Sequence, residues 1–405
     1  MQTNVTKAFL QTSQGKEAEG ILRTCVHCGF CTATCPTYQL LGDELDSPRG
    51  RIYLIKQVLE GQAVTTKTRS HLDRCLTCRS CETTCPSGVR YGRLVDIGRE
   101  IVEQQVPRNM FENTTRFLLR QLIPYPKRFA PLLKLGILFK PVLPKAIQKK
   151  IPRVQKPRNW PSQTQQRKML VLAGCAQQVV TAQTNVSTAA VLNKLGIQLI
   201  SADKAGCCGA VSHHLSAAEE ARRFIRQNID AWWPYIEAGA EAIVVTASGC
   251  GVMLKDYAHI MQDDAEYAAK AKRVCELAKD ISEILRDENL ASLQITPQQS
   301  SVSFHSPCTL QHGLQLNGVV ENILQQMGYD LKHVNDAHLC CGSAGTYSVL
   351  QPTLSKQLLS TKISALENEQ PDIIATANIS CQMHLDTRAS VPVKHWIELV
   401  EQALI

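Results

Sequence analysis

The sequence lacks the motifs by which proteins hold nucleotides and dinucleotides. Its 405 residues contain neither the G-x-G-x-x-G fingerprint of dinucleotide-binding folds nor the G-x-x-x-x-G-K-[ST] loop that cradles nucleotide phosphates. It also lacks a long apolar run: the most apolar stretch, PLLKLGILFKPVLP, is interrupted by lysine and proline and is too short to span a bilayer. Hydride chemistry is therefore expected on another chain, and membrane contact is expected to be peripheral or through a partner.

A secretory signal is not expected either. The N-terminal stretch, MQTNVTKAFLQTSQGKEAEG, is polar and carries charges of both signs. We therefore expect a cytoplasmic protein. In a reducing compartment, cysteine-dense proteins usually bind metal rather than form disulfides. The 17 cysteines of this chain are accordingly expected to be metal ligands or redox groups rather than crosslinks.

Acidic residues are absent from one long stretch. Between Asn113 and Ala202 there is no Asp or Glu, and Lys and Arg alternate there with apolar residues. Prolines recur between Pro124 and Pro161, so we predict an irregular, basic linker over 111–164. Two interpretations stay open: a surface lying on anionic lipid or an acidic partner, or a linker whose apolar residues pack on the next domain. Nucleic-acid binding is not expected, because no recognised binding motif accompanies the charge.

Cysteines, by contrast, form two copies of one pattern, C-x2-C-x2-C-x3-C-P. This is the spacing of bacterial ferredoxins, in which three thiolates hold one [4Fe–4S] cluster and the fourth ligates the other. Zinc sites do not call for the third cysteine or the proline, so the pattern favours iron–sulfur over zinc. We expect two [4Fe–4S] clusters with these ligands: Cys25, Cys28, Cys31 and Cys85 for cluster 1, and Cys75, Cys78, Cys81 and Cys35 for cluster 2.

The two runs belong to a mainly helical domain that we predict over residues 1–110. Between the runs, the segment RGRIYLIKQVLE has helical spacing, with Ile52, Ile55 and Leu59 on one face. A second helix is predicted over 94–105, after the second run. Such a domain passes single electrons between two neighbouring clusters.

The rest of the sequence is an internal duplication. AGCCGAV matches HLCCGSAG, and AGAEAIVVTASGC matches EQPDIIATANISC. Each copy alternates apolar, β-branched runs with helical stretches, which is typical of parallel βαβ units. We therefore predict two similar α/β lobes over 165–295 and 296–405. The predicted fold class is α+β with α/β: a mainly helical two-cluster ferredoxin domain followed by two duplicated α/β lobes.

Each lobe carries a second cysteine pattern, Cys-x31-Cys-Cys-Gly and then a lone cysteine. These cysteines follow predicted strands or lie at Gly-rich turns, and α/β folds bind ligands at the carboxyl ends of their strands. Duplicated vicinal pairs favour redox or metal use over thiols kept for packing. The possible third redox site comprises Cys175, Cys207, Cys208 and Cys250 in the first lobe, and Cys308, Cys340, Cys341 and Cys381 in the second.

This layout resembles the paired CCG cysteine-rich domains of heterodisulfide reductase and its relatives, which hold unusual iron–sulfur clusters or related redox sites. The family pattern ends in C-x-x-C, whereas the last position here is Met253 in the first lobe and His384 in the second. A third cluster in one lobe, a cluster shared between the lobes, and no cluster there all stay open. Cys275 lies outside both patterns and is expected in the core. No catalytic residue is predicted among the nearby histidines.

The order of domains resembles the iron–sulfur subunits of glycolate oxidase, of lactate-utilisation systems and of anaerobic glycerol-3-phosphate dehydrogenase. The segments CVHCGFCTATCPTYQLLGDELDSPRGRIYLIKQVLEG, HLDRCLTCRSCETTCPSGV, CCGSAGTY and VKHWIELVEQAL are most similar to the glycolate oxidase family. The resemblance implies a hetero-oligomer in which FAD-containing partner subunits oxidise glycolate to glyoxylate. It also implies that this chain carries the electrons to an acceptor, such as quinone, at the inner face of the cell membrane.

Two alternatives to glycolate oxidation stay open at this point. One is the iron–sulfur subunit of a lactate or glycerol-3-phosphate dehydrogenase. The other is a heterodisulfide-reductase-like enzyme with catalysis at the CCG cysteines. In the electron-transfer interpretation, FAD is held by the partner subunits alone, and this chain by itself is not expected to be catalytic.

Overall fold

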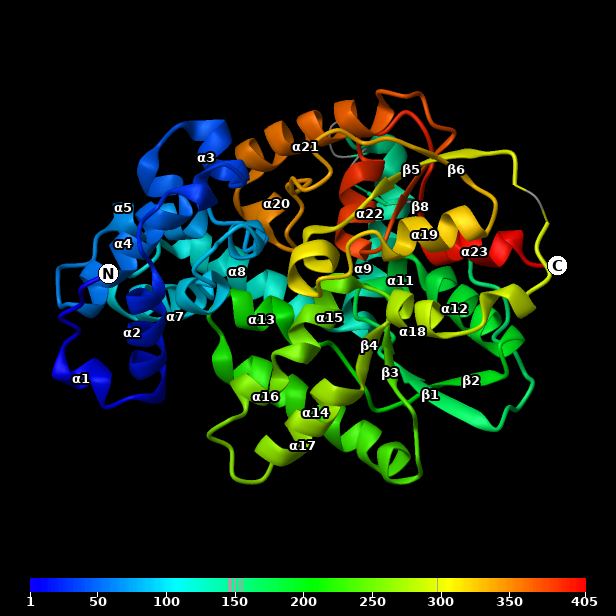
Figure 1. Ribbon diagram of the computed structural model, residues 1–405, viewed down its shortest axis with the longest axis horizontal. Coiled ribbons are helices and arrows are strands. Elements are labelled where there is room, and N and C mark those ends of the chain that lie inside the picture. The colour runs from blue at the N-terminus through cyan, green and yellow to red at the C-terminus, as the bar shows by residue number, and fades with distance from the viewer. Residues whose placement is uncertain (145–147, 149–150, 153, 155, 297) are drawn as a thin grey trace. The chain divides into compact units, whose positions relative to one another are not determined.

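The computed structural model describes residues 1–144, 148, 151–152, 154, 156–296 and 298–405. The chain forms two compact units, and Figure 1 labels their elements. The first unit comprises Met1–Arg116 and His338–Lys362, and the second comprises Phe117–Ala337 and Ile363–Ile405. A segment from the C-terminal half, 338–362, therefore belongs to the same unit as the N-terminal quarter of the chain. We call residues 338–362 the return segment.

The first unit is built from helices. The Ser47 hydroxyl caps α4 (Pro48–Leu59) by accepting a backbone hydrogen bond at 3.0 Å. Ile55 of α4 packs on α7 (Tyr91–Gln105) at Gly98, where an added Cβ would lie 2.6 Å from the Ile55 side chain. Both helices predicted from the sequence are thus confirmed. Other helices of this unit include α1 (Lys7–Leu10), α2 (Ser13–Thr24), α3 (Pro36–Leu41), α5 (Thr66–Asp73), α6 (Ser80–Thr83) and α20 (Tyr347–Leu350).

The second unit holds two four-stranded parallel sheets with the same topology. Their strand orders are β2-β1-β3-β4 and β6-β5-β7-β8, so each strand of one sheet has a counterpart at the same place in the other. This confirms the duplicated α/β fold that the repeated cysteine text predicts. The strands are β1 (Arg167–Val171), β2 (Ile197–Ser201), β3 (Ile243–Val245), β4 (Ala278–Asp280), β5 (Ser301–His305), β6 (Asp330–Lys332), β7 (Ile373–Thr376) and β8 (Val393–His395).

The two sheets share one hydrophobic core. Val171 and Val244 of the first sheet and Val302 and Phe304 of the second belong to a single cluster of buried side chains. The central strands read as near-continuous apolar runs because both faces of each sheet are covered, which is the usual state of a parallel sheet. The covering helices include α12 (Ala182–Lys194), α14 (Ala218–Glu237), α18 (Ile281–Asp287), α19 (Val319–Gln326) and α23 (Trp396–Ala403).

The segment before β1 differs from its prediction. The sequence predicts an irregular linker over 111–164, but its first part is helical, in α8 (Met110–Leu122) and α9 (Pro126–Phe139). Pro126 is tolerated because it lies at the start of α9, where its missing N–H has no partner to lose, and the helix continues past Pro131. No helix in the described part of the chain is long and apolar enough to cross a membrane.

Candidate functional site

The two ferredoxin-type cysteine loops have the same backbone conformation. In the first loop, His27 and Gly29 have positive φ values of 58° and 88°; in the second, Thr77 and Arg79 have values of 52° and 60°. Left-handed backbone is costly for a β-branched residue such as Thr77, so the surrounding structure must stabilise it. Alternating left-handed residues turn successive amides toward one side and form a concave anion site of the kind that surrounds iron–sulfur clusters.

Each loop borders a hollow lined by thiols. The first hollow measures about 420 Å³, including space open to solvent. Apolar side chains such as Val26, Phe30 and Ile52 form part of its wall. Its cysteines are Cys25, Cys28, Cys31, Cys81 and Cys85.

The second hollow is smaller, about 290 Å³, and includes Arg51 and Tyr91 in its wall. Its cysteines are Cys35, Cys75, Cys78 and Cys81. Each hollow thus includes three cysteines of one run and the last cysteine of the other, and the first hollow also includes Cys81; the division of these cysteines between two clusters stays a prediction. No carboxylate lines either hollow among the described residues, so the donor sets fit iron–sulfur clusters and not a hard, oxygen-liganded cation.

Charge distinguishes the two hollows. Burial raises the pKa of Cys31 to about 11 and raises the pKa of Cys25 as well. Burial also acts on Cys75 of the second hollow, but the cations of Arg51 and Arg99 outweigh it and lower the pKa of this thiol. The two arginines therefore favour negatively charged sulfur at Cys75, whereas burial and neighbouring thiols raise the pKa of Cys81, which lines both hollows, well above its usual value.

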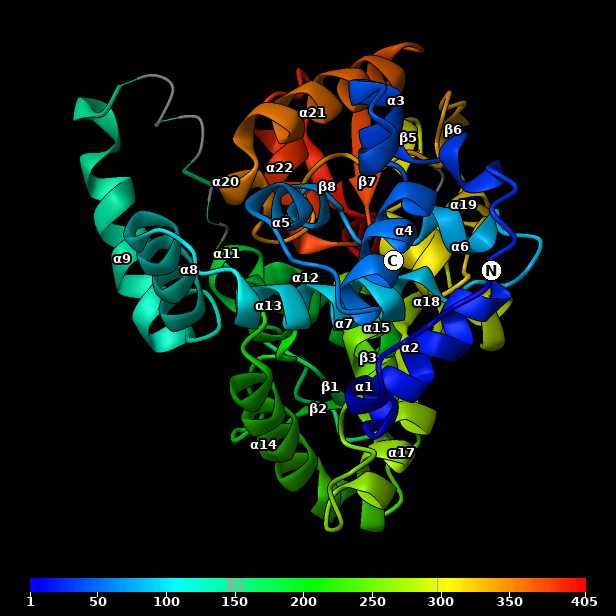
Figure 2. The same cartoon turned by 90° about the vertical axis from the view of Figure 1, so that its left-hand side faces the viewer.

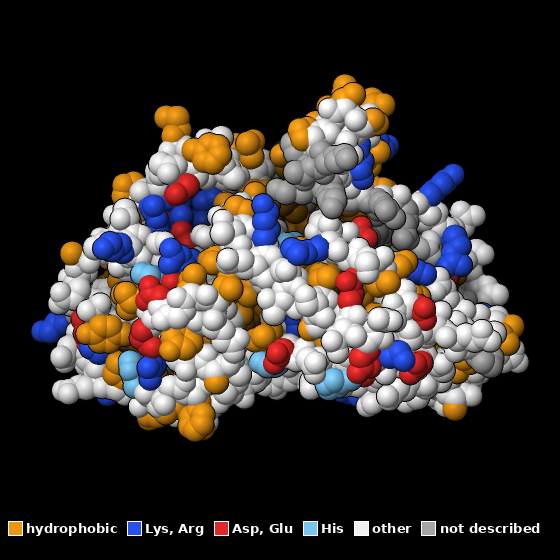
Figure 3. Space-filling view, turned by 90° about the horizontal axis from the view of Figure 1, so that it is seen from above, with side chains coloured by type: hydrophobic (Ala, Val, Ile, Leu, Met, Phe, Trp, Pro, Cys, Tyr) orange, Lys and Arg blue, Asp and Glu red, His pale blue; other side chains and the backbone are white. Residues whose placement is uncertain are grey.

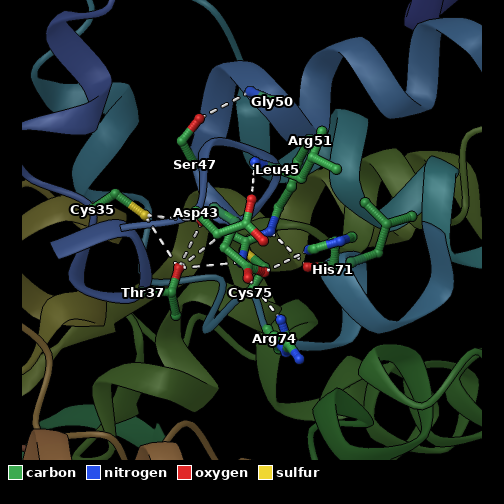
Figure 4. A network of polar contacts seen from close by, with 12 residues as sticks. Cys35, Thr37, Asp43, Leu45, Ser47, Gly50, Arg51, His71, Arg74 and Cys75 are labelled. Atoms are coloured by element: carbon green, nitrogen blue, oxygen red, sulfur yellow. Dashed lines mark hydrogen bonds and ion pairs between the residues drawn. The ribbon is translucent and has the colours of Figure 1, made fainter. Parts of the chain in front are cut away.

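The source of this positive charge is a buried polar network (Figure 4). The Arg51 side chain is 1% exposed, and it donates to Asp46 at 3.2 Å, to Thr37 at 3.1 Å and to the carbonyl of His71 at 2.7 Å. The Asp46 carboxylate is fully buried and also accepts from Arg74 at 2.8 Å. A buried charge must be paired and hydrogen-bonded, and this network meets both conditions.

The network reaches the cysteines directly. The Oγ1 atom of Thr37 lies 3.3 Å from the sulfur of Cys35. The Tyr91 hydroxyl and the Thr77 amide approach the sulfur of Cys75 at 3.5 Å and 3.4 Å. Hydrogen bonds to sulfur are among the features by which a protein sets a cluster's potential.

The return segment contributes to the same loop. Tyr347 donates a hydrogen bond at 3.0 Å to the carbonyl of Arg74, the residue before Cys75. Arg99 of α7 donates to the carbonyls of Leu72 at 2.8 Å and of Cys75 at 2.6 Å. Spacing within the motif gives no sign of these contacts, because they come from distant parts of the chain.

In the first lobe, the four cysteines of the CCG pattern converge. Cys175 follows β1, and Cys250 lies in α15 (Ser248–Lys255) after β3, so both occupy the carboxyl edge of neighbouring strands. The sulfur of Cys207 lies 3.5 Å from that of Cys175, and the sulfur of Cys208 lies 3.4 Å from that of Cys250. Hydrogen bonds from Cys207 and Cys250 lower the pKa of Cys208 well below its usual value.

Two polar side chains that the sequence did not single out hold this loop. Asn228 of α14 donates to the carbonyl of Cys207 at 2.8 Å, and Tyr257 donates to the carbonyl of Cys208 at 2.9 Å. Gly209 has a φ of 90° and approaches α14 so closely that an added Cβ would lie 3.3 Å from a backbone oxygen. Four thiols and a restrained loop fit a metal or redox centre.

The four cysteines of the second lobe are divided between the two units. Cys308 follows β5, and Cys381 lies in α22 (Ile379–Asp386) after β7, where Asn378 donates to its sulfur at 3.4 Å. Cys340 and Cys341 belong to the return segment of the first unit, where they are buried. The duplicated sequence therefore does not produce two equivalent sites within one unit.

The residues that replace the last cysteine of the family pattern differ in burial. Met253 is buried in the core of the first lobe, while His384 is partly exposed on α22. Cys275 packs against the core of the first lobe, and its sulfur donates to the carbonyl of Leu254 at 3.0 Å, as expected for a structural thiol.

Comparison with protein families matches three parts of the chain. A model described as a 4Fe-4S dicluster domain matches residues 21–89. A model described as a cysteine-rich domain matches residues 169–255 and 302–386. The matched parts contain both ferredoxin-type runs and both CCG patterns, and they support iron–sulfur binding by this chain.

A solved structure and several curated relatives are also similar. The crystal structure of a hypothetical protein from Helicobacter pylori aligns with a TM-score of 0.56 over 98% of this chain and 74% of that one; at 9% identity it supports the fold alone. Lactate utilization protein A of Geobacillus kaustophilus is 26% identical over 55% of this chain and 91% of its own length.

Two further relatives match along most of both chains. The probable glycolate oxidase iron-sulfur subunit of Bacillus subtilis is 30% identical over 91% of this chain and 89% of its own length. The glycolate oxidase iron-sulfur subunit of Escherichia coli K12 is 55% identical over 100% of this chain and 99% of its own length. Both cysteine sets lie inside the alignment with the Escherichia coli protein, and the chain belongs to the family of glycolate oxidase iron–sulfur subunits.

Proposed function

We propose that this chain carries electrons from FAD on a partner subunit, where glycolate is oxidised to glyoxylate, to an acceptor at the membrane such as quinone. The observation that carries this proposal is the pair of thiol-lined hollows within one compact unit. Two hollows in one small helical unit form a relay for single electrons, whereas a reaction chamber would need a substrate pocket with catalytic groups.

We assign Cys25, Cys28, Cys31 and Cys85 to cluster 1 and Cys35, Cys75, Cys78 and Cys81 to cluster 2. When bound, a [4Fe–4S] cluster accepts and releases one electron at a time. The chain's own residues hold the sulfur ligands, exclude water and set the surrounding charge. Arg51 and Arg99 perform the last task for cluster 2, because they lower the pKa of Cys75 despite its burial.

Cluster 1 is the proposed entry point for electrons. Cys28 is exposed, and the apolar side chains of Val26 and Phe30 beside it are exposed as well. Electrons tunnel only over short distances, so a partner's flavin must approach a cluster that lies near the surface. The second hollow, with its buried network and the bond from Tyr347, is then the inner relay position.

The first-lobe cysteines form the proposed third redox site. Their four sulfurs converge at the carboxyl edge of the sheet, which is the usual ligand position of an open α/β fold. A third cluster held by Cys175, Cys207, Cys208 and Cys250 would extend the relay beyond the ferredoxin-type unit.

Metal and sulfide analysis tests the cluster assignment. Anaerobically prepared chain should contain about eight iron atoms and as many acid-labile sulfides for two clusters, and about twelve of each for three. If the chain holds three clusters, the double variant Cys175→Ser/Cys250→Ser should contain about four fewer iron atoms. If it holds two, the iron content of this variant should be unchanged. Zinc without acid-labile sulfide would contradict the proposal.

A second experiment tests the direction of electron flow. The chain is purified together with its flavoprotein partner, and glycolate is added without oxygen. Glycolate should bleach the flavin first and the iron–sulfur absorbance afterwards. Turnover of a disulfide substrate by the isolated chain would instead favour catalysis at the CCG cysteines.

A further inference from the structure

Helix α9 in the second unit has two apolar faces, and among the described residues only one of them is packed against a buried cluster. Phe129 and Leu133 pack against a cluster that contains Val180 and Ile379. Figure 2 shows α9 at the edge of its unit, near α11 (Gln177–Val180). The opposite face continues into the short helix η3 (Lys140–Val142), and its apolar side chains are exposed: Leu132, Leu135, Leu138, Phe139 and Val142. We call these five residues the α9 patch.

The α9 patch is a continuous stripe and not a scatter of single residues. Positions 132, 135, 139 and 142 follow the i, i+3, i+7 spacing that places side chains on one face of a helix. Leu138 is 71% exposed and Val142 is 78% exposed, which is far from the burial that a packing role would give them. Contiguous exposed apolar stripes of this kind mark surfaces that meet a partner or a membrane.

The segment that carries the α9 patch has charge of one sign. The sequence has no Asp or Glu from Asn113 to Ala202, and Lys127, Arg128 and Lys134 of α9 are exposed. In the space-filling view, hydrophobic side chains share a projecting edge with Lys or Arg side chains (Figure 3). A basic helix with an aliphatic stripe has the composition of helices that lie in the plane of an anionic lipid surface.

The composition favours lipid over a protein partner. Protein interfaces are enriched in aromatic residues, Met and Arg and depleted in Lys. Four of the five side chains of the α9 patch are instead aliphatic, with Phe139 as the one aromatic, and Lys127 and Lys134 lie on the same helix. We propose that the α9 patch binds the surface of an anionic lipid bilayer and so docks the second unit on the membrane.

Docking by the α9 patch would bring the first-lobe cysteines close to an acceptor in the membrane; this consequence rests on the proposed function. Cys250 packs against the same buried cluster as Phe129 and Leu133, which lie on the inner face of α9. Helix α9, about 10 Å thick, and the small buried cluster beneath it therefore lie between the α9 patch and the first-lobe cysteine site. An electron on that site would have a short path to an acceptor dissolved in the bilayer.

The test is flotation of the full chain, loaded with its clusters, on vesicles of two compositions. We expect binding to vesicles of equal parts phosphatidylcholine and phosphatidylglycerol, weak binding to phosphatidylcholine alone, and partial release by salt. Leu138→Gln/Val142→Gln should weaken binding at least tenfold, since it removes two exposed apolar side chains. Its matched control is Ile405→Gln, which changes an exposed apolar side chain at the C-terminus and should leave binding unchanged.

Charge is tested separately. Lys127→Gln and Lys134→Gln should each weaken binding to the anionic vesicles about fivefold and reduce its salt dependence. Lys67→Gln, an exposed lysine of the first unit, is the control and should have no effect. All these positions are exposed, so folding should be preserved, and unchanged far-UV circular dichroism and iron content check that it is.

Three outcomes would overturn the proposal. One is absence of binding to anionic vesicles by the unaltered chain; another is equal binding by the chain and by Leu138→Gln/Val142→Gln. The third is loss of the flavoprotein partner, without change in vesicle binding, when the α9 patch is altered, because the patch would then be a protein interface. Vesicle binding is measured without glycolate, so a chain that floats but takes no electrons from the partner refutes the proposed function and leaves the docking surface standing.

Discussion

The two thiol-lined hollows are copies that share a backbone and differ in charge. Both cysteine loops use left-handed residues at the same positions. The first hollow has the exposed Cys28 at its rim, whereas the second has Arg51 and Asp46 buried beside it. The cysteine spacing therefore specifies where four sulfurs go, and the side chains around it specify how each copy differs in access and charge.

The two lobes also have equivalent backbone positions that carry different side chains. Asp280 caps α18 after β4, and His395 caps α23 after β8, at equivalent positions of the two sheets. Burial raises the pKa of Asp280 to about 7 and lowers the pKa of His395 to about 4, so both caps are largely uncharged near pH 6. One structural task is thus performed by groups of opposite acid–base type.

The largest expected effect comes from removing one cluster at a time. Cys28→Ser should eliminate cluster 1 and Cys78→Ser cluster 2, each with a loss of about four irons per chain. If cluster 1 is the entry point, Cys28→Ser should leave the flavin reducible by glycolate but stop reduction of the remaining cluster. Cys78→Ser should still allow reduction of cluster 1.

Freeze-quench electron paramagnetic resonance of the glycolate-treated complex distinguishes these cases. The spin coupling between two reduced clusters should disappear in both variants. Cys275→Ser is the matched control, because this thiol lies outside both hollows. Equal reduction of the surviving cluster in both variants would contradict an ordered path from cluster 1 to cluster 2.

A smaller effect should come from removing the charge that distinguishes the hollows. Arg51→Met leaves the buried Asp46 carboxylate without its nearest fully buried cation, which should cost about 3 kcal/mol of folding free energy. It should also lower the reduction potential of cluster 2 by tens of millivolts and leave that of cluster 1 almost unchanged. Redox titration followed by paramagnetic resonance measures both potentials, and urea unfolding measures stability.

Arg49→Met provides the comparison. Arg49 lines the first hollow but pairs with Glu44 at the surface, where an ion pair contributes less than about 1 kcal/mol. The two variants should therefore differ in stability by at least about 2 kcal/mol. Similar shifts of both potentials by Arg51→Met would mean that the network acts on the whole unit and not on one cluster.

The caps of the two lobes predict opposite pH dependences. The folded state favours protonated Asp280, so the contribution of this residue to folding stability falls as the pH rises from about 4 to about 7. The folded state favours neutral His395, whose Nδ1 accepts from the Ile397 amide, so its contribution falls as the pH drops from about 6.5 to about 4. Between pH 5 and pH 6.5 the two effects should largely cancel.

Substitution should expose each effect. In the Asp280→Asn variant, the stability of the second unit should rise by about 2 kcal/mol between pH 5 and pH 6.5, because only the His395 effect remains. In the His395→Gln variant, it should fall by about 2 kcal/mol over the same range. Urea unfolding of the anaerobic protein at several pH values gives the slopes. Parallel slopes in the two variants would show that the caps are not the groups that titrate.

The predictions from sequence succeeded where a feature is local or repeated. The cysteine runs, the helices around Ile55 and the two parallel sheets each depend on spacing within a short window or on comparison of two copies. The helical part of the linker was missed because prolines were weighed without regard to their place in a helix, as Pro126 illustrates. Arg51 was not singled out, since its pairing with Asp46 and Thr37 depends on segments that meet only in the folded unit.

The smallest predicted effect concerns one hydroxyl at the second hollow. Tyr91 is buried, and its Oη lies 3.5 Å from the sulfur of Cys75. Tyr91→Phe keeps the ring in place and removes that contact. It should lower the free energy of unfolding by about 1 kcal/mol, and it should lower the reduction potential of cluster 2 by less than Arg51→Met does. Because the Tyr91 ring lines both hollows, a change of packing would shift both potentials. A shift confined to cluster 2 would therefore identify the hydrogen bond, and not the aromatic ring, as the cause.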